Sequence, residues 1–280
     1  MAKPIVAVIA PGGMGSAVGG RLVERGVDVI TSLAGRSRAS SERAERSGMR
    51  GVPEAEIAKA AFVLSIVPPS EALGLAERLA PILSAARAKP LYIDCNAVSS
   101  ATATRIGAVI TATGTPFADA GIIGGPPKAG YDGPSIYVSG VAADKIALLS
   151  EGGLKIRHLA GPVGAASALK MSYASITKGL TGLATASILA ASRYGAADAL
   201  HAELSASQKA ILATLTRAVP DMFQKAYRFV GEMEEIGAHS ERASTAAIYG
   251  GLAKLYQEIA NDLEGSKRDI AALEAFFKAK

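Results

Sequence analysis

The sequence lacks several residue types that mark particular classes of protein. Its 280 residues include no Trp, one Cys and three His. A lone cysteine, Cys95, cannot form an intramolecular disulfide, so we expect a reducing, cytoplasmic environment. Three histidines, without acidic residues clustered at ligand spacing, give no basis for a metal site, and we expect none.

Long apolar runs and aromatic-rich basic runs are missing as well. We expect no signal peptide, because the apolar start is interrupted at Pro11 and Gly12. The most apolar later segment, residues 180–192, is too short and too rich in small polar residues to span a bilayer. The net charge is +5, but no basic run carries interleaved aromatics. We therefore expect neither a membrane nor a nucleic acid as partner.

What the sequence does contain, up to about residue 160, is an alternation of short apolar runs and helical stretches. Ser70 and Ser99 are the expected N-caps of two of these helices, since a hydroxyl can accept from a first-turn amide. The expected strands are residues 5–10, 27–33, 61–67, 90–95, 115–123, 135–140 and 154–159, and the expected helices are 13–25, 40–47, 70–86 and 99–111. Strands that alternate with helices predict a mostly parallel sheet covered on both faces.

From residue 161 onward the strand signals stop, and the rest of the chain is predicted to be helical. The helices are expected to break near Gly195, Pro220, Gly237 and Gly250–Gly251. The sequence therefore predicts two domains, an α/β domain over residues 1–160 and an all-α domain over residues 161–280.

The first apolar run leads into a glycine-rich turn, Ala10-Pro11-Gly12-Gly13-Met14-Gly15. Gly12 would let the backbone approach a pyrophosphate, and Gly15 would let the next helix pack closely on the strand. The amides at that helix start favour an anion. Ala10 replaces the first glycine of the usual G-x-G-x-x-G pattern, so an ordinary turn is the alternative. The strand before the turn and the helix after it favour dinucleotide binding.

The residues that follow the second strand indicate which dinucleotide. An NAD site would offer an acidic residue there to the ribose hydroxyls. The chain instead has Arg36, Ser37 and Arg38, with no acid until Glu42. These side chains can hold a 2′-phosphate by charge-assisted hydrogen bonds, which favours NADP(H) over NAD(H). The alternative is a solvated basic helix start.

Four segments, in this order along the chain, carry the motifs of one family. "VIAPGGMG" (8–15) is similar to a G-x-G-x-M-G opening, and "LSIVPPSEA" (64–72) looks like a strand that ends in Val-Pro beside the cofactor. "YIDCNAVSSATA" (92–103) is similar to D-x-S-T-x-S-P. The fourth pairs "DAGIIGGPP" (119–127), similar to D-A-P-V-S-G-G, with "GPVGAASALKMSY" (161–173), similar to G-x-x-G-x-x-x-x-x-K. Together they resemble the β-hydroxyacid dehydrogenase and 6-phosphogluconate dehydrogenase-like superfamily.

The resemblance implies a Rossmann domain, doubly wound around its sheet, followed by an all-helical substrate and dimerisation domain. Asn96 is expected to face the nicotinamide ribose and the substrate, and the amides of Gly124 and Gly125 are expected to bind a substrate carboxylate. Lys170 is the expected general acid and base. The full expected cofactor-binding set is Pro11, Gly12, Gly13, Met14, Gly15, Arg36, Ser37, Arg38, Val67, Pro68 and Asn96.

The chain departs from this family pattern at two positions. Ile123 stands where a serine commonly precedes the two glycines, and Ala174 stands where an asparagine follows the lysine by one helical turn. Tyr173 and Lys178 share a helix face with Lys170 and are the residues expected to replace that asparagine. The alternative for Lys170 is a solvated side chain that covers apolar surface with its stem.

A further segment, "YRFVGEMEEIGAH" (227–239), is similar to an R-x-x-x-E-M-x-E stretch of one branch of the superfamily. It makes Arg228 an expected substrate-binding residue, with His239 as a second possibility. The alternative is a charged helix face on which Arg228 pairs with Glu232.

The resemblance implies an NAD(P)-dependent dehydrogenase or reductase that acts on CH–OH. It would transfer hydride between NADP(H) and a small 3-hydroxy acid or a related alcohol or carbonyl compound, and would form a homodimer through its helical domain. Two alternatives stay open. One is imine reduction, which is disfavoured because such enzymes usually lack the lysine. The other is a non-catalytic NADP(H)-binding regulator.

Overall fold

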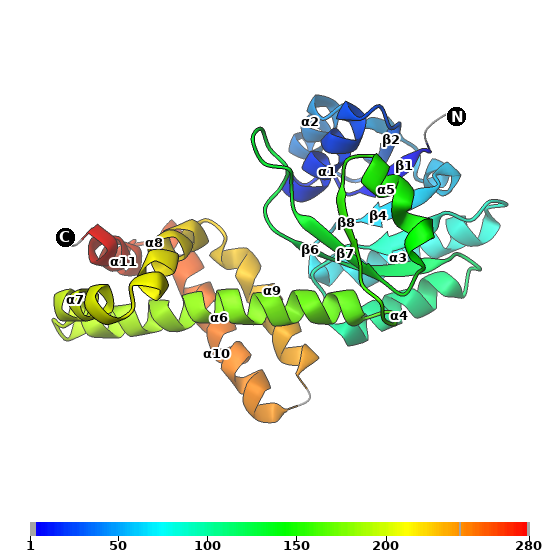
Figure 1. Cartoon of the computed structure of the whole chain (residues 1–280). Helices are drawn as coiled ribbons and strands as arrows, with labels where there is room; N and C mark the ends of the chain where they lie inside the picture. Colours follow the sequence, from blue (N-terminus) through cyan, green and yellow to red (C-terminus); the bar gives the residue numbers. More distant parts are fainter. Residues whose placement is uncertain (1–3, 241, 279–280) are drawn as a thin grey trace. The chain divides into compact units, whose positions relative to one another are not determined.

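The computed structural model describes residues 4–240 and 242–278, and the chain divides into two units, Met1–Met171 and Ser172–Lys280. The first unit contains eight strands in one sheet. They are β1 (Val6–Ile9), β2 (Val29–Ser32), β3 (Arg50–Val52), β4 (Phe62–Ser65), β5 (Leu91–Asp94), β6 (Phe117–Ile123), β7 (Ser135–Ser139) and β8 (Lys155–His158). The expected Rossmann-type α/β fold is confirmed (Figure 1).

The strand order is β3-β2-β1-β4-β5-β6-β7-β8, and every neighbouring pair is parallel except β6 and β7. The helices of this unit are α1 (Gly13–Glu24), α2 (Arg38–Arg46), α3 (Pro69–Ala85), α4 (Ser100–Thr111) and α5 (Ala147–Glu151), with 3-10 turns at Glu54–Lys59 and Ala143–Ile146. The long α6 (Ala165–Arg193) begins in this unit and continues into the next.

Side chains alternate across the sheet and build one core on each of its faces. In β1, Val6 and Val8 pack into one core together with Leu22 of α1. Ala7 and Ile9 pack into the other core together with Leu79 of α3. Successive residues of a strand point to opposite faces, so a run that is buried on both sides reads as continuously apolar.

The structure corrects two details of the sequence prediction. β3 was not expected, because Arg50 and Gly51 are exposed and the strand shows no apolar alternation. Ser70 is not an N-cap, since α3 begins at Pro69 and no side chain caps it. Ser99 does cap α4, and its hydroxyl accepts from the Thr102 amide at 3.2 Å.

The second unit is helical, as predicted. It holds the remainder of α6 with α7 (Ala197–Ser207), α8 (Lys209–Phe223), α9 (Ala226–His239), α10 (Ala243–Glu264) and α11 (Arg268–Lys278). α9 and α10 pack against each other through buried residues that include Met233 and Tyr256. The expected break at Gly250–Gly251 is wrong, because α10 is continuous there. Within the described part of the chain, no helix is both long and apolar enough to cross a membrane.

Candidate functional site

A row of buried polar side chains crosses the middle of the sheet near the carboxyl ends of its parallel strands. Register places Ser65 of β4 beside Asp94 of β5, Asp94 beside Asp119 of β6, and Asp119 beside Ser139 of β7. All four residues are fully buried. Open α/β sheets bind their ligands outside the carboxyl ends of their strands, so this row lies at the edge where a ligand is expected.

The glycine turn lies at this edge, between β1 and α1. Among the described atoms, none lies within 4 Å of where a Cβ on Gly12 or Gly13 would stand, whereas a Cβ on Gly15 would overlap the Ala10 carbonyl oxygen. Gly12 is the N-cap of α1, and no side chain caps that helix. The open backbone and uncapped helix start fit the pyrophosphate of a dinucleotide.

Two side chains hold the turn in place. The Arg43 guanidinium of α2 donates from Nε to the Pro11 carbonyl oxygen at 3.0 Å, and from another nitrogen to Ser40 Oγ at 3.0 Å. Ser16 Oγ donates to the Gly12 carbonyl oxygen at 2.7 Å. Neither residue was predicted from the sequence to hold the turn. Arg43 lies 32 positions after Pro11 in an arginine-rich segment, so no local pattern links it to the turn.

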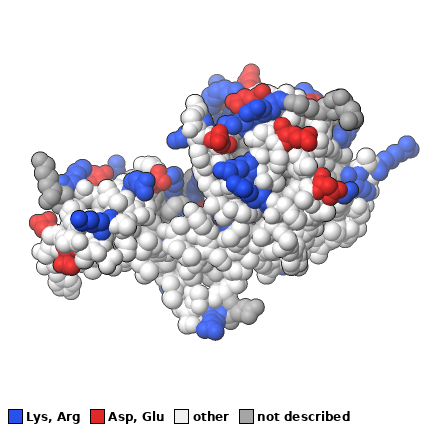
Figure 2. Space-filling view, viewed as in Figure 1, with Lys and Arg blue, Asp and Glu red and all other residues white. Residues whose placement is uncertain are grey.

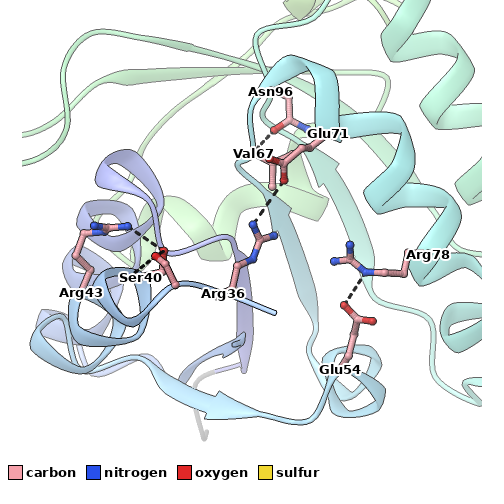
Figure 3. A network of polar contacts seen from close by, with 9 residues as sticks. Arg36, Ser40, Arg43, Glu54, Val67, Glu71, Arg78 and Asn96 are labelled. Carbon is pink, nitrogen blue, oxygen red and sulfur yellow. Dashed lines mark hydrogen bonds and ion pairs between the residues drawn. The ribbon is translucent and has the colours of Figure 1, made fainter. Parts of the chain in front are cut away.

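The three residues predicted to bind a 2′-phosphate follow β2, and each has a partner within the protein. Arg36 pairs with Glu71 of α3 at 3.5 Å, as Figure 3 shows, and Arg38 pairs with Glu42 at 2.8 Å. Ser37 is the N-cap of α2, and its hydroxyl accepts from the Ser40 amide at 3.3 Å. Arg38 is highly exposed, whereas Arg36 is mostly buried.

Asn96 follows β5 and points its amide into the sheet edge (Figure 3). Its Oδ1 accepts from the Val67 amide at 2.7 Å, and its Nδ2 donates to Ser65 Oγ at 2.8 Å and to Asp94 Oδ1. The residue is only 2 % exposed. Asn96 therefore ties β5 to the end of β4 and fixes the backbone that leads into Pro68.

Asp94 is the electrostatically unusual group of this row. Burial, and next the nearby Asp119 carboxyl group, raise the pKa of Asp94 to about 7, against the lowering effect of hydrogen bonds from Asn96 and Ser65. Within the described residues its Oδ2 has no hydrogen-bond partner. Sequence reasoning missed Asp94, because its burial depends on strands that are far apart in the chain.

Asp119 fixes the start of α6, the helix that carries Lys170. Its Oδ2 accepts from the amides of Gly164 at 3.0 Å and Ser167 at 2.9 Å, and its Oδ1 accepts from Ser167 Oγ at 2.6 Å. Ser139 Oγ in turn accepts from the Ala166 amide at 3.0 Å. A buried carboxylate that accepts from first-turn amides satisfies donors that the helix itself leaves unpaired.

Lys170 lies one turn further along α6, half-buried against β6. A Cβ placed on Gly121 would stand 2.7 Å from the Ala166 carbonyl oxygen and 2.9 Å from Lys170 Cβ. The glycine thus lets α6 approach the strand that leads to Gly124 and Gly125. Gly124 has a φ of +123°, and Gly125 has open space where a Cβ would stand.

The remaining predicted site residues belong to the helical unit. Tyr173 is half-exposed. The Lys178 ammonium forms a partly buried ion pair with Glu232 of α9 and lies 4.2 Å from the centre of the Phe229 ring. Glu232 thus pairs with Lys178, while Arg228 is exposed. Among the described residues no group of three His, Cys, Asp or Glu could hold a metal ion.

Several solved structures are similar to this chain over nearly its whole length. The conserved protein MTH1747 of unknown function, reported as similar to 3-hydroxyacid dehydrogenases, is 26% identical with a TM-score of 0.70, and the match covers 96% of this chain and 99% of that one. The Mycobacterium tuberculosis 3-hydroxyisobutyrate dehydrogenase with L-serine is 19% identical with a TM-score of 0.73, and the match covers 98% of this chain and 99% of that one. An imine reductase from Myxococcus stipitatus with NADP+ is 19% identical with a TM-score of 0.54, and the match covers 98% of this chain and 100% of that one.

Sequence comparisons agree with the fold. No curated protein matches the chain significantly. Residues 191–259 match a domain of unknown function, DUF1932, and residues 5–148 match the NAD binding domain of 6-phosphogluconate dehydrogenase. That second match spans the glycine turn, the basic segment after β2 and the polar row. The chain therefore belongs to the family that carries the NAD binding domain of 6-phosphogluconate dehydrogenase.

Proposed function

We propose that the protein is an NADP(H)-dependent oxidoreductase that interconverts a small 3-hydroxy acid, or a related alcohol, and its carbonyl product. Lys170 is the general acid and base of this reaction. The observation that carries the proposal is the anchoring of α6 by Asp119, which holds Lys170 against β6 just before Gly124 and Gly125.

In this proposal, the nicotinamide ring, when bound, accepts or supplies the hydride. The neutral amine of Lys170 takes the hydroxyl proton during oxidation, and its ammonium returns a proton to the developing alkoxide during reduction. The amides of Gly124 and Gly125 bind the substrate carboxylate, which suits their exposed backbone and the open space beside Gly125. Ile123 has no hydroxyl to help them.

The cofactor is held by the turn Pro11–Gly15 and by Val67 and Pro68, while Asn96 positions Val67 through its amide. Arg36, Ser37 and Arg38 bind the 2′-phosphate. Between the two residues proposed to replace the family asparagine, Tyr173 is favoured, because the Lys178 ammonium is engaged by Glu232. Arg228, which is exposed, stays a proposed contact for the substrate carboxylate.

Lys170→Ala tests the assignment of the acid and base. We expect kcat to fall by about 10²–10⁴-fold, because the proton would lose its positioned carrier. The NADPH dissociation constant should stay within about twofold, since the cofactor is held by other residues. Lys254→Ala, at an exposed lysine of α10 that has no proposed role, is the control for loss of one lysine. Unchanged turnover of Lys170→Ala would remove this residue from the mechanism.

A substrate panel separates this proposal from the two alternatives. NADPH oxidation would be followed with aldehydes, keto acids and cyclic imines. Turnover of keto acids or aldehydes supports the proposed function. Turnover of cyclic imines alone indicates an imine reductase, and tight NADPH binding without any turnover indicates a regulator.

A further inference from the structure

A cavity of about 520 Å³ lies beside α1, within the first unit. Its walls are one face of α1, the second half of α2 and residues 127–132 of the loop between β6 and β7. The volume is in the range of small-molecule sites. None of the residues proposed to bind the nicotinamide cofactor lines it.

The side chains around this cavity are mostly cationic. The lining includes Arg21, Arg43, Arg46 and Lys128, against Glu24 and Asp132, which leaves two positive charges in excess. Arg43 and Arg46 are three residues apart on α2, so they share a helix face. In Figure 2, Lys and Arg side chains lie over the α1 and α2 part of this unit, with Asp and Glu side chains among them.

The protein itself engages only part of this positive charge. Arg21 pairs with Glu24 at 3.3 Å and also donates to the Tyr131 carbonyl oxygen at 3.4 Å. Arg43 is held by Pro11 and Ser40. The ion pairs found among residues 4–240 and 242–278 include neither Arg46 nor Lys128. Both side chains are exposed at the rim of the cavity.

We propose that this cavity is a second ligand site, which binds a small molecule through a phosphate group. A phosphate dianion matches the excess of two positive charges, and guanidinium groups bind its oxygens by paired, charge-assisted hydrogen bonds. Arg46 comes from α2 and Lys128 from the loop, so two different walls of the cavity each supply a cation for the phosphate. Tyr131 and the Arg21 side chain line the rest of the space.

Binding at this cavity has a structural consequence for the loop. A ligand held by both Arg46 and Lys128 joins α2 to residues 127–132, which begin two positions after Gly125. The Tyr131 hydroxyl also lies against Gly124, within 2.6 Å of where a Cβ would stand. The bound phosphate therefore orders the segment that carries Gly124 and Gly125. An ordered Gly124–Gly125 segment would raise turnover, and this effect alone rests on the proposed function.

Calorimetric titration of the full chain with inorganic phosphate, at constant ionic strength, tests the binding. We expect saturable binding that weakens at least tenfold in the double variant Arg46→Ala/Lys128→Ala. The matched control, Arg105→Ala/Lys155→Ala, removes two exposed cations elsewhere in the unit and should bind like the wild type. All four positions are exposed, so the variants are expected to fold, which circular dichroism would check.

A second control separates this cavity from the cofactor site. Arg36→Ala/Arg38→Ala should retain phosphate binding, and phosphate should slow amide hydrogen exchange in residues 127–132. No saturable heat below about 10 mM phosphate in the wild type would overturn the proposal. So would equal binding by the Arg46→Ala/Lys128→Ala variant, or loss of binding only in Arg36→Ala/Arg38→Ala. Phosphate binding in a protein without carbonyl turnover would reject the proposed function and leave this site standing.

Discussion

At the scale of single residues, Asp94 is a carboxyl group that the fold stabilises in its protonated form. Folding raises its pKa from 3.8 to about 7 through burial and the neighbouring Asp119. The folded protein therefore binds this proton more tightly than the unfolded chain between these two values. The stability that Asp94 contributes is present below about pH 4 and is lost as the pH rises to about 7.

Asp94→Asn should remove this pH dependence. The amide keeps an Oδ1 acceptor for Asn96 but carries no charge to bury. We expect the variant to gain free energy of unfolding relative to the wild type at pH 8, by up to about 4 kcal/mol, and to gain much less at pH 5. Urea denaturation at the two pH values measures this difference. An equal change at both would show that ionisation of Asp94 is not the cause.

Arg36 and Glu71 make cofactor preference testable at the same scale. Their contact is 3.5 Å, and Glu71 is half-exposed, so the carboxylate competes with a 2′-phosphate for the guanidinium. Arg36→Ala should raise the KM for NADPH by about 10–100-fold, which corresponds to one or two charge-assisted hydrogen bonds, and leave that for NADH nearly unchanged. Glu71→Gln should shift the preference toward NADPH. A wild type that prefers NADH would contradict the assignment of Arg36 and Arg38.

At the scale of secondary-structure elements, α6 depends on a side chain from the sheet rather than on a local cap. Asp119→Ala would leave the amides of Gly164 and Ser167 without their buried acceptor. We expect a loss of about 1–3 kcal/mol in the free energy of unfolding. Because Lys170 would also lose its fixed position, kcat should fall more than the NADPH affinity does. Asp119→Asn, which keeps an acceptor, should recover part of both losses.

A purely structural role for Asp119 would leave kcat unchanged in the fraction of the variant that remains folded. Turnover per folded molecule, measured below the unfolding transition, makes this distinction. The Ser139→Ala variant provides a comparison, since the Ser139 hydroxyl accepts from one amide of the same turn, that of Ala166, and donates a long hydrogen bond to Asp119. We expect its effects to have the same direction and a smaller size.

The elements also show what the sequence could predict. Strands such as Val6–Ile9 and Phe62–Ser65 are buried on both faces, so their apolar runs predicted them correctly. The edge strand Arg50–Val52 lies largely in solvent and has no such run. The motif around Asn96 predicted that its side chain faces the nicotinamide ribose and the substrate, whereas its amide is engaged by Val67, Ser65 and Asp94. Its inward orientation could not be predicted, because it depends on Ser65 and Val67, about 30 residues earlier.

Across the whole molecule, the contacts that determine the site join residues distant in sequence. Asp119 caps a helix turn 45 to 48 residues later, and Lys178 meets Glu232 after 54 residues. Sequence patterns report burial and local geometry, whereas such pairs depend on the complete topology. The glycine turn could be predicted from its own pattern and Lys170 from the family resemblance, but neither gave any indication of the cavity beside α1, whose walls come from three separate segments.

The whole-molecule property that stays a prediction is the homodimer formed through the helical unit. α6 exposes Ile176, Leu180 and Leu183, which lie on one face by their spacing of three and four residues, and Ile176 is 71% exposed. An exposed apolar stripe of this kind favours burial against a partner.

Ile176→Lys/Leu183→Lys should convert a dimer into a monomer, because two ammonium groups would have to be buried in the interface. Light scattering coupled to size-exclusion chromatography measures the mass of each form. The exposed Ile248→Lys on α10 is the matched control and should leave the mass unchanged. A wild type that is already a monomer at micromolar concentration, or a dimer that tolerates both lysines, would contradict this interface.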